Sequence, residues 1–186
     1  KDGSLSSSRF GADIALISLS HPDMNGVDQV GRAERVPFVI DGPGEYEVKD
    51  IFIKGFPSES KYGVKGEEEK MNTMYQLTLE GMNLCFLGAL SSANLRADAK
   101  EAFDDVDILF VPIGGEGVLD AAEAYKLAVS IEPKIIIPMH YGAIGEKDAL
   151  TKFLKEAGEK PEQIEKLTIK KKELEGKEGE VVVLKN

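Results

Sequence analysis

The sequence predicts a single mixed α/β domain built from layers of strands and helices. Short strand-like runs dominate the first half of the chain, and strand-like and helix-like segments alternate in the second half. No internal repeat divides the chain, and its 186 residues, 42% of them hydrophobic, suffice for one continuous core but leave little room for a second full domain. We therefore expect one domain over residues 1–186.

The first half is expected to consist mainly of strands and tight turns. Residues 12–19 are apolar and rich in branched side chains, which predicts a buried strand that runs into a loop at residues 20–23. The Asp-Gly-Pro-Gly sequence at residues 41–44 predicts a tight turn between two strands, since glycine and proline favour turn conformations. The other expected elements are strands at residues 36–40, 51–56, 74–79 and 83–87 and a polar surface loop at 57–70.

The second half is expected to alternate strands with helices. Residues 106–112 and 134–140 are short apolar runs typical of buried strands. Between them, apolar residues recur at helical spacing over residues 120–131, and Asp120 at the start is a residue type that favours the N-cap. The remaining expected elements are helices at 94–103 and 148–157, the latter closed by Gly158, and a final β pair around 167–169 and 181–184.

Charge and cysteine content restrict the classes of function. A formal net charge of −10 would repel a phosphate backbone, so we expect no nucleic-acid partner. Cys85 is the only cysteine, which excludes an intramolecular disulfide and a cysteine-rich zinc site and agrees with a reducing cytoplasm. The polar, serine-rich residues 1–9 lack the apolar run of a signal peptide, and no segment has the roughly 20 apolar residues of a membrane span. We expect a cytoplasmic protein with no membrane partner.

The two histidines of the chain are candidate metal ligands. His21 and His140 each lie just past the end of an expected strand, and loops at strand ends of α/β sheets commonly hold ligand-binding side chains. With Asp23 they would form a three-ligand set for one zinc or other divalent ion, with a position left open for water. The alternative is that all three residues serve only in capping and packing.

Other polar groups are weaker candidates for chemistry. Asp41 and Glu45 flank the Gly-Pro-Gly turn and could act as acid and base. Alternatively, they could be exposed acids beside a turn that needs glycine and proline for its backbone conformation. Cys85 lies in an apolar strand, where a thiol usually packs as a small hydrophobic group. The lysine run at residues 170–172 is bordered by acids and is expected to form a solvated face.

Four segments of the chain carry a resemblance to a known family, and they are residues 18–25, 40–48, 85–90 and 135–141. Their most specific motifs are Asp-Gly-Pro-Gly-Glu-Tyr and Ile-Pro-Met-His-Tyr. These segments resemble the metallo-β-lactamase superfamily, specifically the bacterial branch of predicted zinc-dependent hydrolases related to L-ascorbate-6-phosphate lactonase. The resemblance extends over nearly all of the chain and implies a four-layer αβ/βα sandwich that here lacks its opening strands.

The sequence departs from this family at most of the metal-binding positions. The family's His-x-His-x-Asp-His signature falls on residues 19–24, where only His21 and Asp23 match. The family's Gly-Asp pair, whose aspartate bridges two metals, falls on Gly88 and Ala89, and a methyl group cannot coordinate a cation. With His140 as the only other histidine, the chain cannot supply the histidine-rich two-metal site that activates hydroxide in such enzymes.

Two functional hypotheses follow. The first is a hydrolase-like protein with at most one zinc, manganese or iron ion on His21, Asp23 and His140, acting on an ester, lactone or phosphoester. Asp23, Asp41 and Glu45 would then be its catalytic residues. The second is a catalytically silent binding or assembly module that retains the fold. Because relatives place a β-hairpin region before the position of Lys1, we also expect either a longer native polypeptide or another chain that covers this edge. The resemblance to relatives that assemble as homo-oligomers implies a homo-oligomer as a further expectation.

Overall fold

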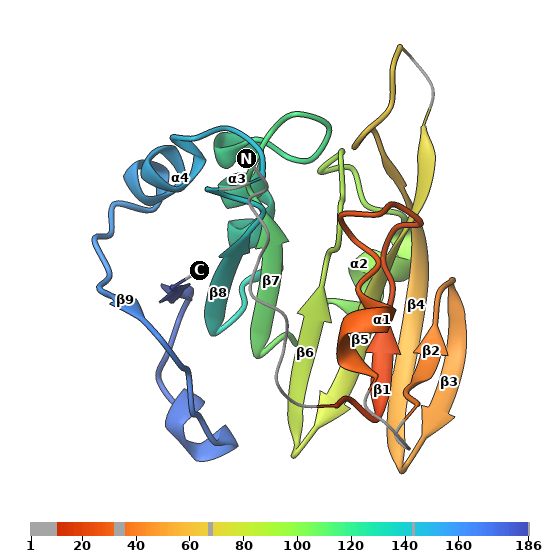
Figure 1. Ribbon diagram of the computed structural model, residues 1–186. Coiled ribbons are helices and arrows are strands. Elements are labelled where there is room, and N and C mark those ends of the chain that lie inside the picture. Colours follow the sequence, from red (N-terminus) through yellow and green to blue (C-terminus); the bar gives the residue numbers. More distant parts are fainter. Residues whose placement is uncertain (1–10, 32–35, 67–68, 143, 186) are drawn as a thin grey trace.

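The computed structural model describes residues 11–31, 36–66, 69–142 and 144–185. It contains a seven-stranded sheet, covered on one face by three helices and on the other by two small two-stranded sheets (Figure 1). The predicted mixed α/β class is therefore confirmed. The polar stretch expected at residues 1–9 lies outside the described residues. In the part of the chain that is described, no helix has the length and hydrophobicity needed to cross a bilayer.

The large sheet combines an antiparallel half with a parallel half. Strands β3 to β6 form an antiparallel meander, whereas β7, β8 and β10 run parallel to β6. Parallel neighbours need crossover connections, and each of the three connections here contains a helix. The strands, in spatial order, are β10 (Glu180–Val181), β8 (Ile135–Met139), β7 (Ile108–Pro112), β6 (Met82–Phe86), β5 (Lys70–Leu79), β4 (Ile51–Ser60) and β3 (Gly44–Val48).

The two small sheets lie over the same face of the large sheet. One pairs β1 (Ile14–Leu16) with β2 (Phe38–Ile40), and the other pairs β9 (Gln163–Ile164) with β11 (Val183–Leu184). The turn predicted at residues 41–44 is confirmed, but it joins strands of different sheets, since β2 lies in a small sheet and β3 in the large one.

Local signals explain where the longer helices begin and end. The Asp120 carboxylate accepts a hydrogen bond from the Glu123 backbone N–H and caps α3 (Ala121–Ile131), as predicted. Gly158, at φ 68°, ends α4 (Ala149–Ala157) in the left-handed conformation that glycine adopts readily. The shorter helical elements are α1 (Val27–Val30), α2 (Ala97–Ala102) and the 3₁₀ turn η1 (Lys171–Leu174).

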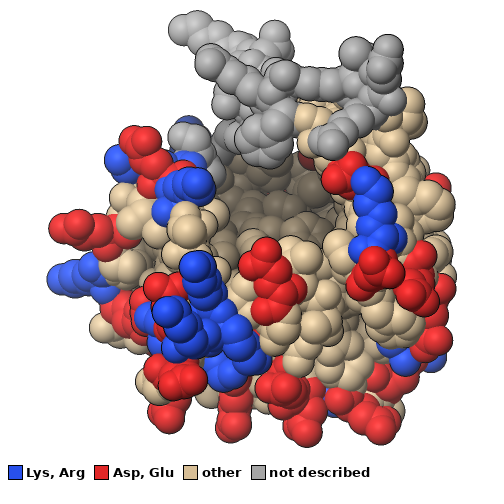
Figure 2. Space-filling model, turned by 90° about the horizontal axis from the view of Figure 1, so that it is seen from below, with Lys and Arg blue, Asp and Glu red and all other residues tan. Residues whose placement is uncertain are grey.

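Successive side chains along the parallel strands point to opposite faces of the sheet, and this alternation divides the core between the two faces. Leu109, Val111 and Ile136 pack with Phe103 and Phe153 beneath α2, α3 and α4. On the opposite face, another cluster joins the sheet to the C-terminal segment, and a further one joins it to β1 and β2. Seen from below Figure 1, basic and acidic residues are intermixed beside a hollow whose visible wall is uncharged (Figure 2).

Two expectations about local structure were wrong. The loop predicted at residues 57–70 is shorter, because β4 extends to Ser60 and β5 begins at Lys70. Polar residues at 58–60 remain in register with β5 because strand pairing satisfies their backbone groups. No strand forms at residues 167–169, and β11 pairs instead with β9, while Leu167 and Ile169 pack against the apolar cluster without joining a ladder.

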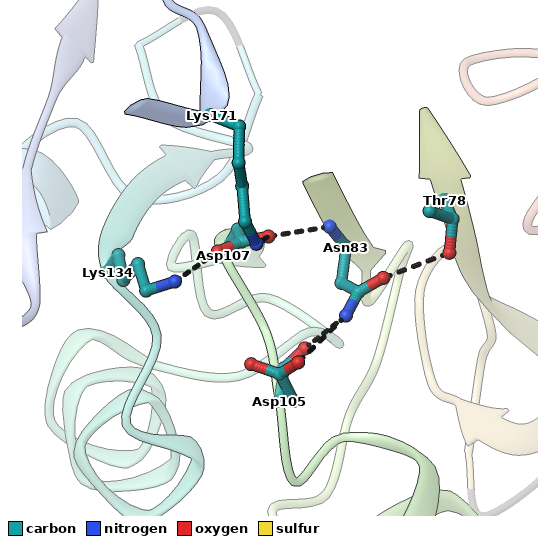
Figure 3. A network of polar contacts seen from close by, with 6 residues as sticks. All are labelled: Thr78, Asn83, Asp105, Asp107, Lys134 and Lys171. Atoms are coloured by element: carbon teal, nitrogen blue, oxygen red, sulfur yellow. Dashed lines mark hydrogen bonds and ion pairs between the residues drawn. The ribbon is translucent and has the colours of Figure 1, made fainter. Parts of the chain in front are cut away.

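A polar network ties together the ends at which the parallel strands begin (Figure 3). The fully buried Asp107 carboxylate accepts hydrogen bonds from Lys134 Nζ and Lys171 Nζ, each at 2.6 Å, and from the Asn83 backbone N–H at 2.8 Å. Burial alone raises the pKa of Asp107, but the two ammonium groups and the backbone donor outweigh it and lower the pKa below its ordinary value. The lysine run is therefore not only a solvated face, because Lys171 anchors η1 to the sheet.

Candidate functional site

Loops from five parts of the chain converge at the carboxyl ends of the parallel strands, opposite the Asp107 network. The Ile113 N–H donates to the Met139 carbonyl at 3.0 Å, and the Glu146 N–H donates to the Gly114 carbonyl at 2.7 Å, which joins the loops after β7 and β8. The Lys61 N–H donates to the Gly117 carbonyl at 3.2 Å and adds the loop between β4 and β5. This edge is where α/β sheets commonly bind ligands.

His21 and Asp23 lie on a short segment after β1 that is fastened to β5. The Thr73 N–H donates to the Ser18 carbonyl at 2.7 Å, which fixes the approach of this segment. The Asp23 backbone N–H donates to His21 Nδ1 at 3.2 Å, and the same nitrogen lies 3.6 Å from Asp23 Oδ2. A Cβ on Gly63 would lie 2.5 Å from His21 Nε2, so the glycine lets the β4–β5 loop lie directly against the imidazole.

Tyr62 contacts all three predicted metal ligands. Its hydroxyl donates to Asp23 Oδ2 at 2.9 Å, and its ring meets the His21 ring edge-on at 5.0 Å between centroids. The His140 ring lies 6.4 Å away on the same measure. Burial, together with the negative charge of Asp23, raises the pKa of Tyr62 to about 12, so the phenol stays protonated and acts as a donor at neutral pH.

His140 directly follows β8 and has an unusual backbone conformation. Its φ of 56° is left-handed, and its Nδ1 atom is buried with no hydrogen-bond partner among the described residues. Burial lowers the pKa of the imidazole from 6.5 to about 4, so it is neutral at physiological pH. Gly114 permits this arrangement, since a Cβ there would lie 2.1 Å from the His140 carbonyl oxygen.

A buried amide fixes the loop that carries Gly88 and Ala89. Asn72 is fully buried, and its Oδ1 accepts the Ala89 N–H at 2.8 Å. The Asn72 amide also donates to Ser58 Oγ at 2.8 Å and to the Leu87 carbonyl at 3.0 Å. Both ends of the amide are therefore satisfied, and the loop is held by neutral hydrogen bonds at the position where the resemblance expects a metal-bridging aspartate.

Asp41 and Glu45 are not brought to this cluster. Glu45 lies on the edge strand β3, opposite Lys54 in register, and its carboxylate pairs with the Lys54 ammonium at 3.1 Å. Gly44 pairs with Gly55, which lies five residues before β4 ends at Ser60. At 3.3 Å per residue this separation is roughly 16 Å along the strand. The structure thus assembles His21, Asp23 and His140 around Tyr62, a residue that no sequence signal singled out, and leaves the two turn acids apart.

The residues present do not form a ready metal site. Among the described residues, no three side chains of His, Cys, Asp or Glu are grouped so that they could hold an ion. His21 Nδ1 accepts a backbone N–H, Asp23 accepts the Tyr62 hydroxyl, and the Tyr62 ring lies against both histidines. In this arrangement His21 Nδ1 and the Asp23 carboxylate are hydrogen-bonded within the protein, whereas His140 Nδ1 has no partner among the described residues.

Solved structures with the same fold include several hydrolase-like proteins. A protein from Thermotoga maritima, assigned to the Zn-dependent hydrolases of the metallo-β-lactamase superfamily, is 27% identical with a TM-score of 0.67, and the alignment covers 95% of this chain and 84% of that chain. A protein from Parabacteroides distasonis, described as a metal-dependent hydrolase, is 19% identical with a TM-score of 0.61. The alignment covers 96% of this chain and 80% of that chain, and the likeness supports the fold alone.

Curated relatives match over shorter stretches. A UPF0173 protein from Pyrococcus furiosus is 46% identical over 43 residues, which are 23% of this chain and 20% of the relative. A UPF0173 metal-dependent hydrolase from Carboxydothermus hydrogenoformans is 53% identical over 38 residues, 20% of this chain and 17% of the relative. Each match thus spans about a fifth of the relative's length. The family model described as a beta-lactamase superfamily domain matches residues 3–140, and the chain therefore belongs to that superfamily.

Proposed function

We propose that this chain keeps the fold of a metal-dependent hydrolase family but uses the loops at the carboxyl ends of its parallel strands as a binding site, without two-metal hydrolysis. The observation that carries the proposal is the state of Asp23, whose carboxylate accepts the Tyr62 hydroxyl at 2.9 Å. A carboxylate that ligates a metal needs its oxygens directed at the ion. Here one of those oxygens is bonded to a protonated side chain.

The loop at Gly88 and Ala89 supports the same proposal. Ala89 carries a methyl group in place of a bridging carboxylate, and its backbone N–H donates to Asn72 Oδ1 at 2.8 Å. Gly88, at φ 63°, packs so closely that a Cβ would lie 2.6 Å from Asn72 Oδ1. The buried amide and the close packing replace metal coordination as the element that holds this loop.

The alternative is a mononuclear hydrolase acting on an ester, lactone or phosphoester. The Nδ1 atom of His140, which has no partner among the residues that the structure describes, favours it, because buried polar atoms normally have a partner and a metal would provide one. Asp41 and Glu45 gain no support as proton carriers, since the turn that bears them lies away from the cluster. A homo-oligomer, or a second chain over the sheet edge, belongs to the binding proposal and is tested by the mass of the native protein in solution.

Metal content distinguishes the two functions. The protein is purified without chelator or added metal, and zinc, manganese and iron are measured per chain in the wild type, in His140→Ala and in Glu101→Ala, an exposed control on α2. We expect folded wild-type protein with less than one ion per chain and no hydrolysis of lactones or phosphoesters. One ion per chain that is lost in His140→Ala but kept in Glu101→Ala, together with turnover, would support the mononuclear hydrolase and end the binding proposal.

A further inference from the structure

We propose that the outer edge of β2 binds an extended segment of a partner protein, which adds a third strand to the small sheet and carries basic side chains at its ends. This edge is distinct from the loops after β7 and β8, so its binding goes beyond the proposed function. Three features of the described residues support it: the backbone groups of β2, the apolar side chains beside them and the charge of the segment that follows.

One side of β2 has no partner strand among the described residues, since the small sheet pairs it with β1 alone. The Phe38 N–H donates to the Asp13 carbonyl at 2.9 Å. The Ile17 N–H donates to the Ile40 carbonyl at 2.8 Å. Because backbone groups alternate in direction along a strand, the N–H and carbonyl of Val39 point to the side away from β1. A further strand could pair with them there.

The two edges of the large sheet are protected, in contrast to β2. At β10, the Glu159 carboxylate accepts the Val181 N–H at 3.3 Å and so occupies a donor of the edge strand. At β3, Glu45 and Glu47 are exposed and place negative charge along the other edge. Charged side chains on edge strands commonly prevent unwanted strand pairing. Residues 36–40, which include all of β2, contain no charged residue.

Apolar side chains are exposed on and beside the same strand. Val36, Phe38 and Val39 are 84%, 53% and 39% exposed, so three large apolar side chains within four residues contact water. An added strand would cover part of this surface while it pairs with the backbone of Val39, as in other cases of strand addition. A third strand with apolar contacts also stabilises a sheet that has only two strands.

Negative charge beside β2 defines the chemistry of the partner. Residues 36–48 contain three acidic residues, Asp41, Glu45 and Glu47, and no lysine or arginine. The Lys54 ammonium pairs with Glu45, but neither Asp41 nor Glu47 has an ion-pair partner among the described residues. Lysine or arginine at the ends of an added strand would complement these charges.

The acids of β3 are on the side of the molecule where β2 lies. Tyr46 and Val48 of β3 pack against the same apolar cluster as Ile40 of β2, and Figure 1 shows both strands at this side. A second copy of this chain would bring the same acids to the interface, and the net charge of −10 opposes the approach of two copies. A basic segment of another protein therefore fits this edge better than self-association does.

A synthetic peptide tests the edge. The probe has a core of alternating valine and threonine with lysines at both ends, and fluorescence anisotropy of an attached label measures its binding. We expect a dissociation constant below about 1 mM that rises at high salt, because salt screens the charges. The same peptide with glutamate in place of lysine should bind about tenfold more weakly. Backbone N-methylation of the core valines removes the donors for strand pairing and should also weaken binding about tenfold.

Substitutions locate the binding edge. Val39→Lys repels a basic partner and places a charge on the edge strand, so we expect about tenfold weaker binding of the lysine peptide. Val129→Lys is the matched control, because it adds the same charge at a valine of α3 that is 52% exposed, and it should leave the affinity unchanged. Thermal melting checks that both variants are folded.

Several results would overturn the proposal. They are no binding of the lysine peptide, equal binding of the N-methylated peptide, or equal losses of affinity in Val39→Lys and Val129→Lys. A wild-type dimer in solution that Val39→Lys dissociates would also overturn it, because a second copy would then occupy this edge. A failure of the proposed function would appear instead as bound metal and turnover in the wild-type protein, and these do not depend on the peptide.

Discussion

The two ends of the large sheet differ in how completely their buried polar groups are hydrogen-bonded to the described residues. Where β7 and β8 begin, the Asp107 carboxylate receives two ammonium groups at 2.6 Å and a backbone N–H at 2.8 Å (Figure 3). Where they end, His140 Nδ1 has no partner in the described part of the chain, and Asp23 shares one hydrogen bond with Tyr62. A fully satisfied network stabilises a fold, whereas an unsatisfied group remains available to a ligand. We infer that the Asp107 network at the first end stabilises the fold and that the side chains at the second end serve in binding.

The largest expected effect is at the satisfied end. Asp107→Ala leaves Lys134 and Lys171 without their shared carboxylate and the Asn83 N–H without an acceptor. Both lysines are partly exposed and can regain water, so we expect a loss of about 3 kcal/mol in the free energy of unfolding, at the low end for a broken buried ion pair. Urea denaturation at pH 7 measures it.

An acid on the same network provides the control. Asp105 is exposed and accepts a hydrogen bond from the Asn83 side chain at 3.1 Å, so Asp105→Ala should cost less than about 1 kcal/mol. Equal losses of unfolding free energy in Asp107→Ala and Asp105→Ala would contradict the expectation that the buried acid contributes more than the exposed one.

The same network should give a pH dependence. Because the Asp107 pKa is lowered in the folded protein, its contribution to stability should be present above about pH 4 and disappear as the pH falls further. Asp107→Asn should reduce the loss of stability at acid pH.

The second effect concerns the packing beneath His140. In Gly114→Ala the new Cβ would lie 2.1 Å from the His140 carbonyl oxygen, and a backbone atom cannot rotate away as a flexible side chain would. We expect a loss of about 2–3 kcal/mol in unfolding free energy and a shift of the His140 ring resonances in NMR spectra. Gly42→Ala, where a Cβ meets nothing within 4 Å, should change stability little. Unchanged His140 resonances in Gly114→Ala would show that this packing does not position the histidine.

The third effect is a pH dependence at the unsatisfied end. Burial lowers the pKa of His140 from 6.5 to about 4. The unfolded chain therefore binds a proton at this residue below about pH 6.5, whereas the folded protein binds it only below about pH 4. Stability should therefore fall as the pH drops through this window, by about 2 kcal/mol between pH 7 and pH 5. Denaturation at both pH values measures it in the wild type and in His140→Asn, whose side chain does not titrate and tolerates φ 56°. Equal losses in the two proteins would assign the pH dependence to other groups.

Local patterns were sufficient to predict much of the fold. The buried apolar runs at β7 and β8 and the caps Asp120 and Gly158 each depend on residues close in sequence, and the structure agrees with them within one or two residues. The final β pair at 167–169 failed because an alternating apolar pattern shows which side chains are buried but not which strand they join.

The candidate site was only partly predictable for the same reason. His21 and His140 follow strands, so their place at the sheet edge could be inferred from neighbouring residues. Tyr62 reaches Asp23 across 39 residues, and Lys171 reaches Asp107 across 64. Contacts over such separations depend on the packing of the whole domain, and a single sequence gives no local signal for them.

The buried Cys85 gives the protein an internal reporter of its own opening. Its thiol is fully buried in the core cluster between β6 and the helices α2, α3 and α4, and burial raises its pKa, so a thiol reagent in solution can react only after this core opens. Since Cys85 is the only cysteine among 186 residues, every labelled molecule records one opening of the core on this face of the sheet. The labelling rate under native conditions would thus follow the opening of this core without any substitution in the chain.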